Sequence, residues 1–308
     1  MRPASRNLMQ NLPLVSIVTP AFNQAEYLAQ TIESVLAQDY PNIEYIVLDD
    51  GSSDNTPAIL SLYDGRFVHQ RHVNMGQART LNKGWSMARG SLIGYLSSDD
   101  VLHPQAISRL VQALIDHSNA VVAYCDFELI DATGRTFRTV CAEDYDSNRL
   151  QVDLVCQPGP GALFHRSVFD QTGGWAEHLR QVPDFEFWLR ASRFGPFIRV
   201  PQVLAGYRVH DGSASFSATT ADRSMEIVGV MAAHWHGQVG PKVNASKAAA
   251  HLLAAKSHAQ SGRLASTLSE WISAICYKPG ALLSVAAWRM LLSGLLRRAT
   301  YKVLQRGK

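Results

Sequence analysis

Several features are missing from this 308-residue sequence, and each absence excludes a class of protein. No stretch of about 18 uninterrupted apolar residues is present, so the sequence predicts no membrane-spanning helix. Residues 1–13 lack the apolar core of a signal peptide. The four cysteines are widely spaced and form no C-x-x-C motif, which argues against a zinc site and a disulfide framework. We therefore expect free thiols in a reducing cytoplasm.

Acidic residues are missing from the end of the chain. From Trp271 onward there are seven Lys or Arg residues and no Asp or Glu, although the net charge of the whole chain is only +3, too small to indicate nucleic-acid binding. Apolar residues recur at spacings of three and four over residues 285–303, and Arg298, Lys302 and Arg306 lie beside them. This pattern predicts a basic amphipathic helix. It either lies on an anionic membrane surface or docks on the rest of the chain or a second subunit.

The first hundred residues alternate between apolar runs and helical patterns. Four runs are typical of buried strands, and they cover residues 14–22, 43–50, 66–72 and 91–100. Apolar residues at helical spacing predict helices over residues 28–36, 57–62 and 77–88. In "DNTP" we expect Thr56 to cap a helix that starts at Pro57. The alternation indicates an α/β fold with a mostly parallel central sheet flanked by helices.

The rest of the chain is less regular and then becomes helical. The patterns predict a helix, a strand and its hairpin partner over residues 107–114, 120–130 and 135–140. After Gly212 the sequence is rich in alanine, and residues 248–279 predict two helices joined by a turn. We expect three regions: an N-terminal tail over 1–12, an α/β domain over 13–215, and an α-helical C-terminal region with a basic tail over 216–308.

Two of the predicted strands end in paired acids, Asp49-Asp50 and Asp99-Asp100. In open α/β sheets, ligands bind beyond the carboxyl ends of the strands, so both pairs are expected at one crevice. Four carboxylates are tolerated together only where a cation or hydrogen-bond donors neutralise them. A divalent cation that carries a phosphorylated ligand meets this need, because hard cations take oxygen ligands and bridge phosphates. The alternative is that both pairs only shape turns or cap helices.

Five segments, in this order, resemble the motifs of family 2 glycosyltransferases, the inverting nucleotide-sugar transferases with the GT-A fold. They read "VSIVTPAFNQAEYLAQTIESVLAQDYPNIEYIVLDDGSSDNT", "NMGQARTLNKGWSMARGSLIGYLSSDD", "GPGALFHRSVFDQTGGW", "DFEFWLR" and "YRVHDGSAS". The resemblance covers about residues 14–215. It implies a GT-A fold for this part of the chain and a nucleotide-sugar donor as substrate.

The resemblance also implies how the nucleotide is recognised. By similarity, Pro20, Ala21 and Phe22 line the pocket for the base, and Phe22 is placed to stack on it. Asp50 would accept a hydrogen bond from the ring N–H of a uracil or thymine. Without the resemblance, Phe22 could equally be an aromatic residue of the core.

Five further residues match the parts of the family site that hold the phosphates and the metal ion. Gln77 and Arg79 would approach the nucleotide or the donor sugar, and Asp99 would lie near the ribose or the sugar. Asp100 is the expected ligand of Mg²⁺ or Mn²⁺, which would neutralise the diphosphate leaving group. His210 aligns with a histidine that ligates the metal or contacts the diphosphate in some GT-A enzymes.

The base that activates the acceptor is implied in "PDFEFWLR". Asp184 matches the catalytic aspartate of the family, with Glu186 as the fallback base. The family usually has Glu directly before this Asp, whereas this chain has Pro183. Arg190, one helical turn after Glu186, could pair with it and turn it outward. The segments that match the sugar and acceptor pocket contain Gly159, Gly161 and Trp175.

The implied reaction is metal-dependent inverting transfer from a nucleoside-diphosphate sugar, UDP or dTDP favoured, to a hydroxyl of a glycan or lipid-linked acceptor. We expect a role in cell-surface polysaccharide synthesis and a cytoplasmic enzyme, peripheral on the inner face of the plasma membrane through its tail. A non-catalytic nucleotide-sugar-binding or scaffold protein is one alternative. A sugar nucleotidyltransferase is another. Such an enzyme needs a glycine and a cationic residue after the first strand, and the segment "PAFNQAEYL" at this place contains neither.

Overall fold

Residues 12–210, 218–280 and Trp288 are described by the structure, which is a computed structural model. The chain divides into two compact units. The first unit comprises Met1–Tyr145, Gln157–Glu177 and Phe187–His210, and the second comprises Asp146–Cys156, His178–Glu186 and Asp211–Lys308. The second unit therefore includes two short earlier segments besides the helical region predicted over 216–308.

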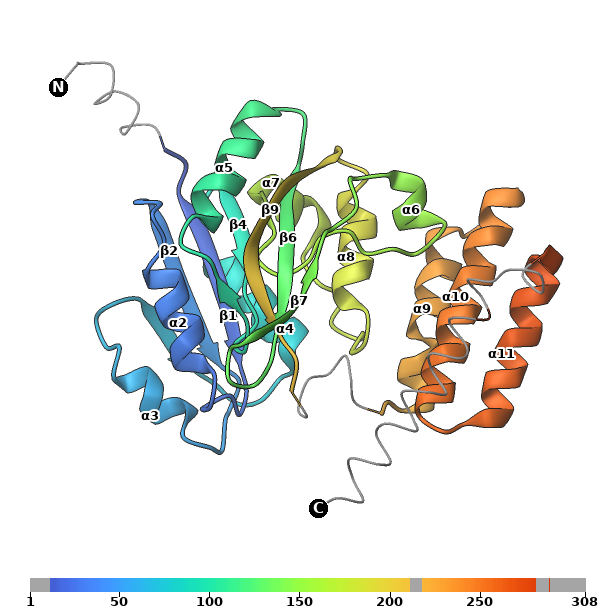
Figure 1. Cartoon of the computed structure of the whole chain (residues 1–308), viewed down its shortest axis with the longest axis horizontal. Coiled ribbons are helices and arrows are strands. Elements are labelled where there is room, and N and C mark those ends of the chain that lie inside the picture. Colours follow the sequence, from blue (N-terminus) through green and yellow to red (C-terminus); the bar gives the residue numbers. More distant parts are fainter. Residues whose placement is uncertain (1–11, 211–217, 281–287, 289–308) are drawn as a thin grey trace. The chain divides into compact units, whose positions relative to one another are not determined.

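A nine-stranded sheet forms the framework of the first unit (Figure 1). Its order is β3-β2-β1-β4-β8-β6-β9-β5, and β7 pairs with β6. The first four strands in this order are parallel: β3 (Val68–Arg71), β2 (Ile43–Asp49), β1 (Val15–Ala21) and β4 (Leu92–Tyr95). β6 (Val122–Ile130) and β9 (Phe197–Arg208) are also parallel to each other. The antiparallel members are β8 (Leu163–His165), β5 (Val101–Leu102) and β7 (Thr136–Val140).

These strands confirm the four predicted runs and the hairpin over 120–130 and 135–140. The helices of the first unit also begin close to the predicted positions: α2 (Leu28–Leu36), α3 (Thr56–Ser61), α4 (Gln77–Met87) and α5 (Ala106–Asp116), with α7 (Arg166–Thr172) after β8. The predicted first residue of one helix was wrong. α3 begins at Thr56 with Asn55 at the N-cap position, because the Thr56 hydroxyl accepts a hydrogen bond from the backbone N–H of Gln24 instead.

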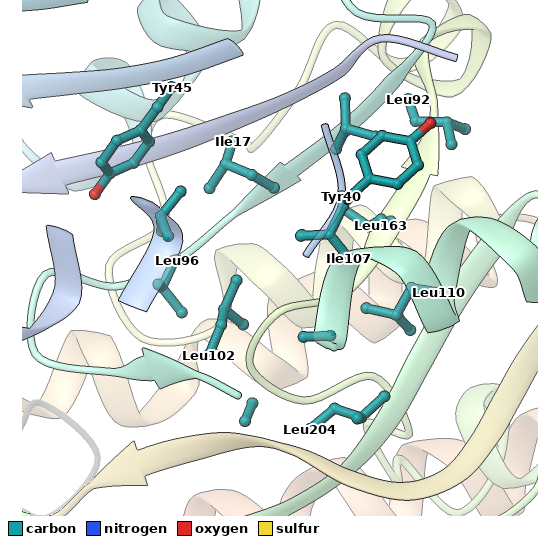
Figure 2. Packing of buried hydrophobic residues seen from close by; sticks show 14 of the residues in the cluster. Ile17, Tyr40, Tyr45, Leu92, Leu96, Leu102, Ile107, Leu110, Leu163 and Leu204 are labelled. Carbon is teal, nitrogen blue, oxygen red and sulfur yellow. The ribbon is translucent and has the colours of Figure 1, made fainter. Parts of the chain in front are cut away.

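The core of the first unit fixes where the strand ends lie. All seven residues of β1 are buried, as expected for a strand covered on both faces. Ile17, Leu96 and Leu102 belong to the same hydrophobic cluster (Figure 2). Within it, the hydroxyl of Tyr45 donates to Thr19 Oγ1 at 3.1 Å, so this buried polar atom is satisfied. Loops that follow these strands therefore start from rigid positions.

Helices make up most of the second unit (Figure 1). They are α6 (Ser147–Gln151), α9 (Ala221–His234), α10 (Pro241–Gln260) and α11 (Leu264–Tyr277), and α8 (Pro183–Ala191) begins in this unit and ends in the first. α10 packs against both α9 and α11, which confirms the predicted helix pair over 248–279. None of the helices in the described ranges is long and apolar enough to cross a membrane. The predicted amphipathic helix lies outside the described residues, apart from Trp288.

Candidate active site

The loops after β1 and β2 are joined by side-chain hydrogen bonds. Three oxygens of the second loop accept bonds from three consecutive backbone N–H groups of the first: Ser52 Oγ from Asn23 at 2.9 Å, Thr56 Oγ1 from Gln24 at 3.0 Å and Asp54 Oδ2 from Ala25 at 3.0 Å. In return, Asn23 Oδ1 accepts the N–H of Ser53 at 2.8 Å. Asn23 has a φ of 53°, a conformation that asparagine tolerates well. These bonds fix the path of the chain directly after Phe22.

Removal of the Ser52 hydroxyl should loosen this connection. Ser52 is buried, so Ser52→Ala leaves the Asn23 N–H without its acceptor and should destabilise the protein by about 1–2 kcal/mol. Urea unfolding measures this loss. Ser53→Ala is the matched control, because that exposed hydroxyl makes only a 3.3 Å bond to Asn23. Equal effects of the two substitutions would contradict the assignment.

The first acidic pair is held mainly by backbone N–H groups. Asp49 shapes its turn, as expected: its Oδ1 accepts the N–H of Ser52 at 2.9 Å. Asp50 accepts the N–H of Met75 on Oδ1 at 2.6 Å and that of Gly76 on Oδ2 at 2.9 Å, and it is almost fully buried. Asp50 thus ties the end of β2 to the start of α4. Each oxygen has a second lone pair for another donor, so the predicted contact with a base stays open.

The predicted base pocket has one exposed ring. Phe22 is 47% exposed, which makes it available for stacking and excludes the alternative that it is a core residue. Pro20 and Ala21 end β1 in register with Leu48 and Asp49, and both are buried. The backbone carbonyl of Ala21 accepts the N–H of Asp50 at 2.8 Å. Phe22 and Asp50 therefore follow two hydrogen-bonded strand ends.

The second acidic pair follows β4, and His210 lies beside it. His210 Nε2 is 3.0 Å from Asp99 Oδ2, and the His210 ring packs on Tyr27 with centroids 4.7 Å apart. Asp100 is buried, and its Oδ1 accepts the backbone N–H of Arg208 at 2.8 Å. Burial, and after it the charge of Asp99, raises the pKa of Asp100 well above its usual range, although Arg208 opposes this shift. The structure thus places His210 beside Asp99, the chain neighbour of Asp100.

Arg208 connects this pair to the rest of the first unit. Its side chain is fully buried, and Nε donates to the carbonyl oxygen of Asp99 at 2.7 Å. The guanidinium also donates to the carbonyl oxygen of Asp131 at 3.1 Å and to Gln30 Oε1 at 2.8 Å, and it lies 4.9 Å from the centroid of the Tyr27 ring. A buried cation with this many acceptors fixes the loop after β4 and offsets part of its negative charge.

The donor atoms here suit a hard divalent cation. Asp100 Oδ2 accepts no hydrogen bond from the described residues, and Asp99 and His210 offer oxygen and nitrogen atoms beside it. Within the described ranges, His, Cys, Asp and Glu residues form no compact group of three ligands. Mg²⁺ is commonly held by one or two carboxylates, with phosphate oxygens of the substrate as further ligands. The residues therefore fit a cation that arrives with a phosphorylated ligand.

The candidates at α4 are exposed. Gln77 is the first residue of α4, after Gly76 with a φ of 90°. Arg79 Nε is 3.0 Å from Glu177 Oε2, and both side chains are about half exposed, so this ion pair is weak and easily exchanged. The predicted contact of Arg79 with phosphate stays a prediction.

The glycine segment and Trp175 pack tightly against protein groups. A Cβ atom at Gly159 would lie 2.8 Å from the Phe127 ring, and one at Gly161, where φ is +77°, would lie 2.7 Å from Leu102. Trp175 is 4% exposed and contacts Tyr95 with ring centroids 5.0 Å apart. Its Nε1 is a buried donor with no hydrogen-bond partner among the described residues. Packing alone thus accounts for the two glycines, and the role of all three in a sugar pocket stays a prediction.

Asp184 lies in the second unit, in the first turn of α8. It lines a cavity of about 330 Å³ formed by residues of that unit alone. Burial raises the pKa of Asp184, and the backbone N–H of Phe185 opposes the shift in part. A carboxyl group with a raised pKa in a cavity is suited to proton transfer near neutral pH.

The fallback base lies in the same helix turn. Glu186 is half-buried, and its backbone N–H donates to the carbonyl oxygen of Val182 at 3.1 Å. Arg190 donates to the carbonyl oxygens of Thr172 and Gly174 at 2.6 and 2.5 Å, so much of its hydrogen-bonding capacity is used by backbone.

The family model described as glycosyl transferase family 2 matches residues 16–173 of this chain. The chain belongs to glycosyl transferase family 2. An uncharacterized glycosyltransferase of Rickettsia typhi is 32% identical over 215 residues, which are 67% of each chain. Chondroitin synthase of Escherichia coli is 27% identical over 213 residues, covering 67% of this chain and 30% of that protein. As a member of this family, the protein is a glycosyltransferase.

Solved structures show that this glycosyltransferase has the GT-A fold. Residues 1–349 of S. aureus TarS, in complex with UDP-GlcNAc, superpose with a TM-score of 0.64 at 15% identity, covering 94% of this chain and 91% of that 1–349 chain. The mannosyltransferase PcManGT from Pyrobaculum calidifontis, in complex with GDP-Man and Mn²⁺, superposes with a TM-score of 0.61 at 17% identity, covering 96% and 88%. At these identities the likeness concerns the fold.

Sequence reasoning missed Arg208 and the bonds between the two loops of this glycosyltransferase. A signal for Arg208 was present, because it stands two residues before His210 in "YRVHDGS". A charged residue there is more often solvated than buried, so the pattern alone did not single it out. The roles of Ser52, Asp54 and Thr56 depend on a partner loop about thirty positions earlier.

Proposed function

We propose that this glycosyltransferase is metal-dependent and inverting, and that it uses a nucleoside-diphosphate sugar with a uracil or thymine base. Its acceptor is a hydroxyl of a glycan or a lipid-linked glycan, in cell-surface polysaccharide synthesis at the inner face of the plasma membrane. The observation that carries the metal-dependent part is Asp100, with one oxygen fixed by the Arg208 N–H and the other accepting no hydrogen bond from the described residues. Phe22 is exposed, and its ring would stack on the base. Asp50 is buried, and its carboxylate would accept a hydrogen bond from the base.

In this mechanism each unit supplies one part of the reaction. The first unit binds the nucleotide and orients its diphosphate, and Asp99 and Asp100, with His210, would hold Mn²⁺ or Mg²⁺. When bound, the cation would stabilise the negative charge that develops on the leaving diphosphate. Asp184 in the second unit takes the proton of the acceptor hydroxyl at its carboxylate oxygen. The hydroxyl oxygen then attacks the anomeric carbon opposite the departing nucleoside diphosphate, so the configuration inverts.

A panel of nucleotide sugars, assayed for hydrolysis and transfer with and without Mn²⁺, tests this proposal. We expect activity with UDP- or dTDP-sugars that EDTA removes and Mn²⁺ or Mg²⁺ restores. Asp100→Asn should lower the activity at saturating donor by roughly 10²-fold or more, because several kcal/mol of leaving-group stabilisation depend on this site.

Asp116→Asn is the matched control, since that exposed carboxylate only accepts a hydrogen bond from Gln112 on the surface of α5. Metal-independent turnover that Asp100→Asn does not change would refute the metal assignment. Nucleotide-sugar binding without any turnover would favour the scaffold alternative.

A further inference from the structure

The cavity beside Asp184 contains two cationic side chains. Its walls come from residues 154–156, the segment that leads into α8, and helices α9 and α10. Its charged lining residues are Asp184, Arg223 on α9 and Lys256 on α10. The volume of about 330 Å³ is at the small end of ligand pockets, which suits one or two sugar residues better than a nucleotide sugar.

The polar groups that hold the cavity together are already paired. Ser224 on α9 and Ser257 on α10 join their hydroxyls at 2.8 Å, and Arg263 donates to Ser224 Oγ at 2.7 Å. Glu226 accepts the backbone N–H groups of Arg180 and Gln181, at 2.9 and 2.6 Å on Oε2. The wall is therefore preorganised, and the carboxylate of Glu226 is committed to the segment before α8.

Arg223 differs from these groups. Its guanidinium makes no hydrogen bond or ion pair with the described residues, and only its backbone N–H is used, to Thr220 Oγ1 at 3.3 Å. The residue is exposed and lines the cavity, so the coplanar N–H donors of its guanidinium group are available to a ligand. Lys256 adds a second positive charge to the same lining. Asp184 is the one acid among the described lining residues, so positive charge predominates among them.

We propose that the acceptor carries an anionic group, a phosphate or a carboxylate, which Arg223 and Lys256 bind while Asp184 faces the reacting hydroxyl. This inference rests on the proposed function, because it assigns the cavity to the acceptor. Arg binds planar or tetrahedral oxyanions through two donors at once, and a cation on a neighbouring helix adds attraction without a defined geometry. A neutral glycan would offer the Arg223 guanidinium no oppositely charged group to bind.

Matched acceptor pairs test the proposal in transfer assays with the full-length protein. The pairs are methyl glucoside with methyl glucuronide, and glucose with glucose 6-phosphate, so the carboxylate and phosphate arms are separate. We expect kcat/KM to favour one anionic member by about tenfold or more, since a charge-assisted hydrogen bond contributes about that factor. Arg223→Ala and Lys256→Ala should each remove most of this preference, with the change in KM for the anionic acceptor rather than in kcat.

A binding measurement that needs no turnover separates this proposal from the proposed function. Inorganic phosphate and glucuronate should raise the melting temperature of the wild-type protein and of Lys242→Ala, a control on the exposed side of α10. Neither anion should do so for the Arg223→Ala/Lys256→Ala double variant. Anion binding by the wild type without any sugar transfer would support the site and count against the proposed function. Equal use of neutral and anionic acceptors, or equal anion effects on wild type and double variant, would overturn the proposal.

Discussion

We expect Asp184→Asn to lose about 10²–10⁴-fold in sugar transfer while nucleotide binding stays unchanged. The amide keeps the size of the side chain and its place in the first turn of α8, but it cannot take a proton from the acceptor. The proposed donor-binding residues Phe22, Asp50 and Asp100 belong to the first unit, and Asp184 belongs to the second. Initial transfer rates measure the loss, and calorimetry with UDP measures binding.

Two further variants show whether the loss is specific to Asp184. Asp222→Asn is the matched control, because this exposed acid lies in the first turn of α9 and does not line the cavity. Glu186→Gln tests the fallback base. Full transfer by Asp184→Asn together with a large loss in Glu186→Gln would move the role of the base to Glu186.

Ionisation of Asp184 should have opposite effects on the activity and on the stability of the wild-type protein. Because burial raises the pKa of Asp184, kcat/KM of the wild type should rise with pH through a value above the ordinary 3.8. The unfolded chain keeps the ordinary value, so ionisation of Asp184 costs the folded state free energy, and stability falls as pH rises between the two values. Asp184→Asn should match the wild type in melting temperature below this window and exceed it above. Arg223 and Lys256 are the charged residues that face Asp184 in the cavity.

The parallel part of the fold could be predicted because its signals are local. An apolar run such as 43–49 and an apolar spacing such as that of 28–36 are recognised from neighbouring residues alone. A sheet covered on both faces requires both apolar strands and amphipathic helices that cover them. Asp49 and Asp50 lie at the end of β2 as predicted, whereas β4 ends at Tyr95, four residues before Asp99. The turn role of Asp49 followed from its position at the end of a strand, two residues before a glycine.

Long-range partners could not be predicted from the sequence. Ser52 and Thr56 accept hydrogen bonds from residues 29 and 32 positions earlier, and nothing in "DGSSDNT" identifies that loop. Glu226 binds the segment before α8 from more than forty positions away. The composition of the second unit, which takes residues 146–156 and 178–186 from within the α/β region, likewise depends on such contacts.

Arg208→Met should destabilise the protein by about 3–5 kcal/mol, the loss typical when one partner of a buried charged network is removed. Methionine has a similar length and fills the space, but the carbonyl oxygen of Asp99 loses its donor and that of Asp131 keeps only the N–H of Gly134. The backbone N–H of residue 208 can still donate to Asp100 Oδ1, because this bond does not involve the side chain of residue 208. Without the guanidinium, the charges of Asp99 and Asp100 repel each other with less compensation. Urea denaturation measures the loss.

A bound cation should restore part of the stability that Arg208→Met removes. If Asp99 and Asp100 hold Mn²⁺ with a nucleoside diphosphate, adding both should stabilise the variant and the wild type, whereas Asp100→Asn should gain much less. Arg66→Met is the control for loss of an arginine, because its ion pair with Glu33 is more than half exposed and should contribute less than about 1 kcal/mol. If Arg208→Met does not fold, Arg208→Lys keeps the charge without the fork and should lose less stability. Wild-type stability in either variant would show that the buried guanidinium does not organise the loop after β4.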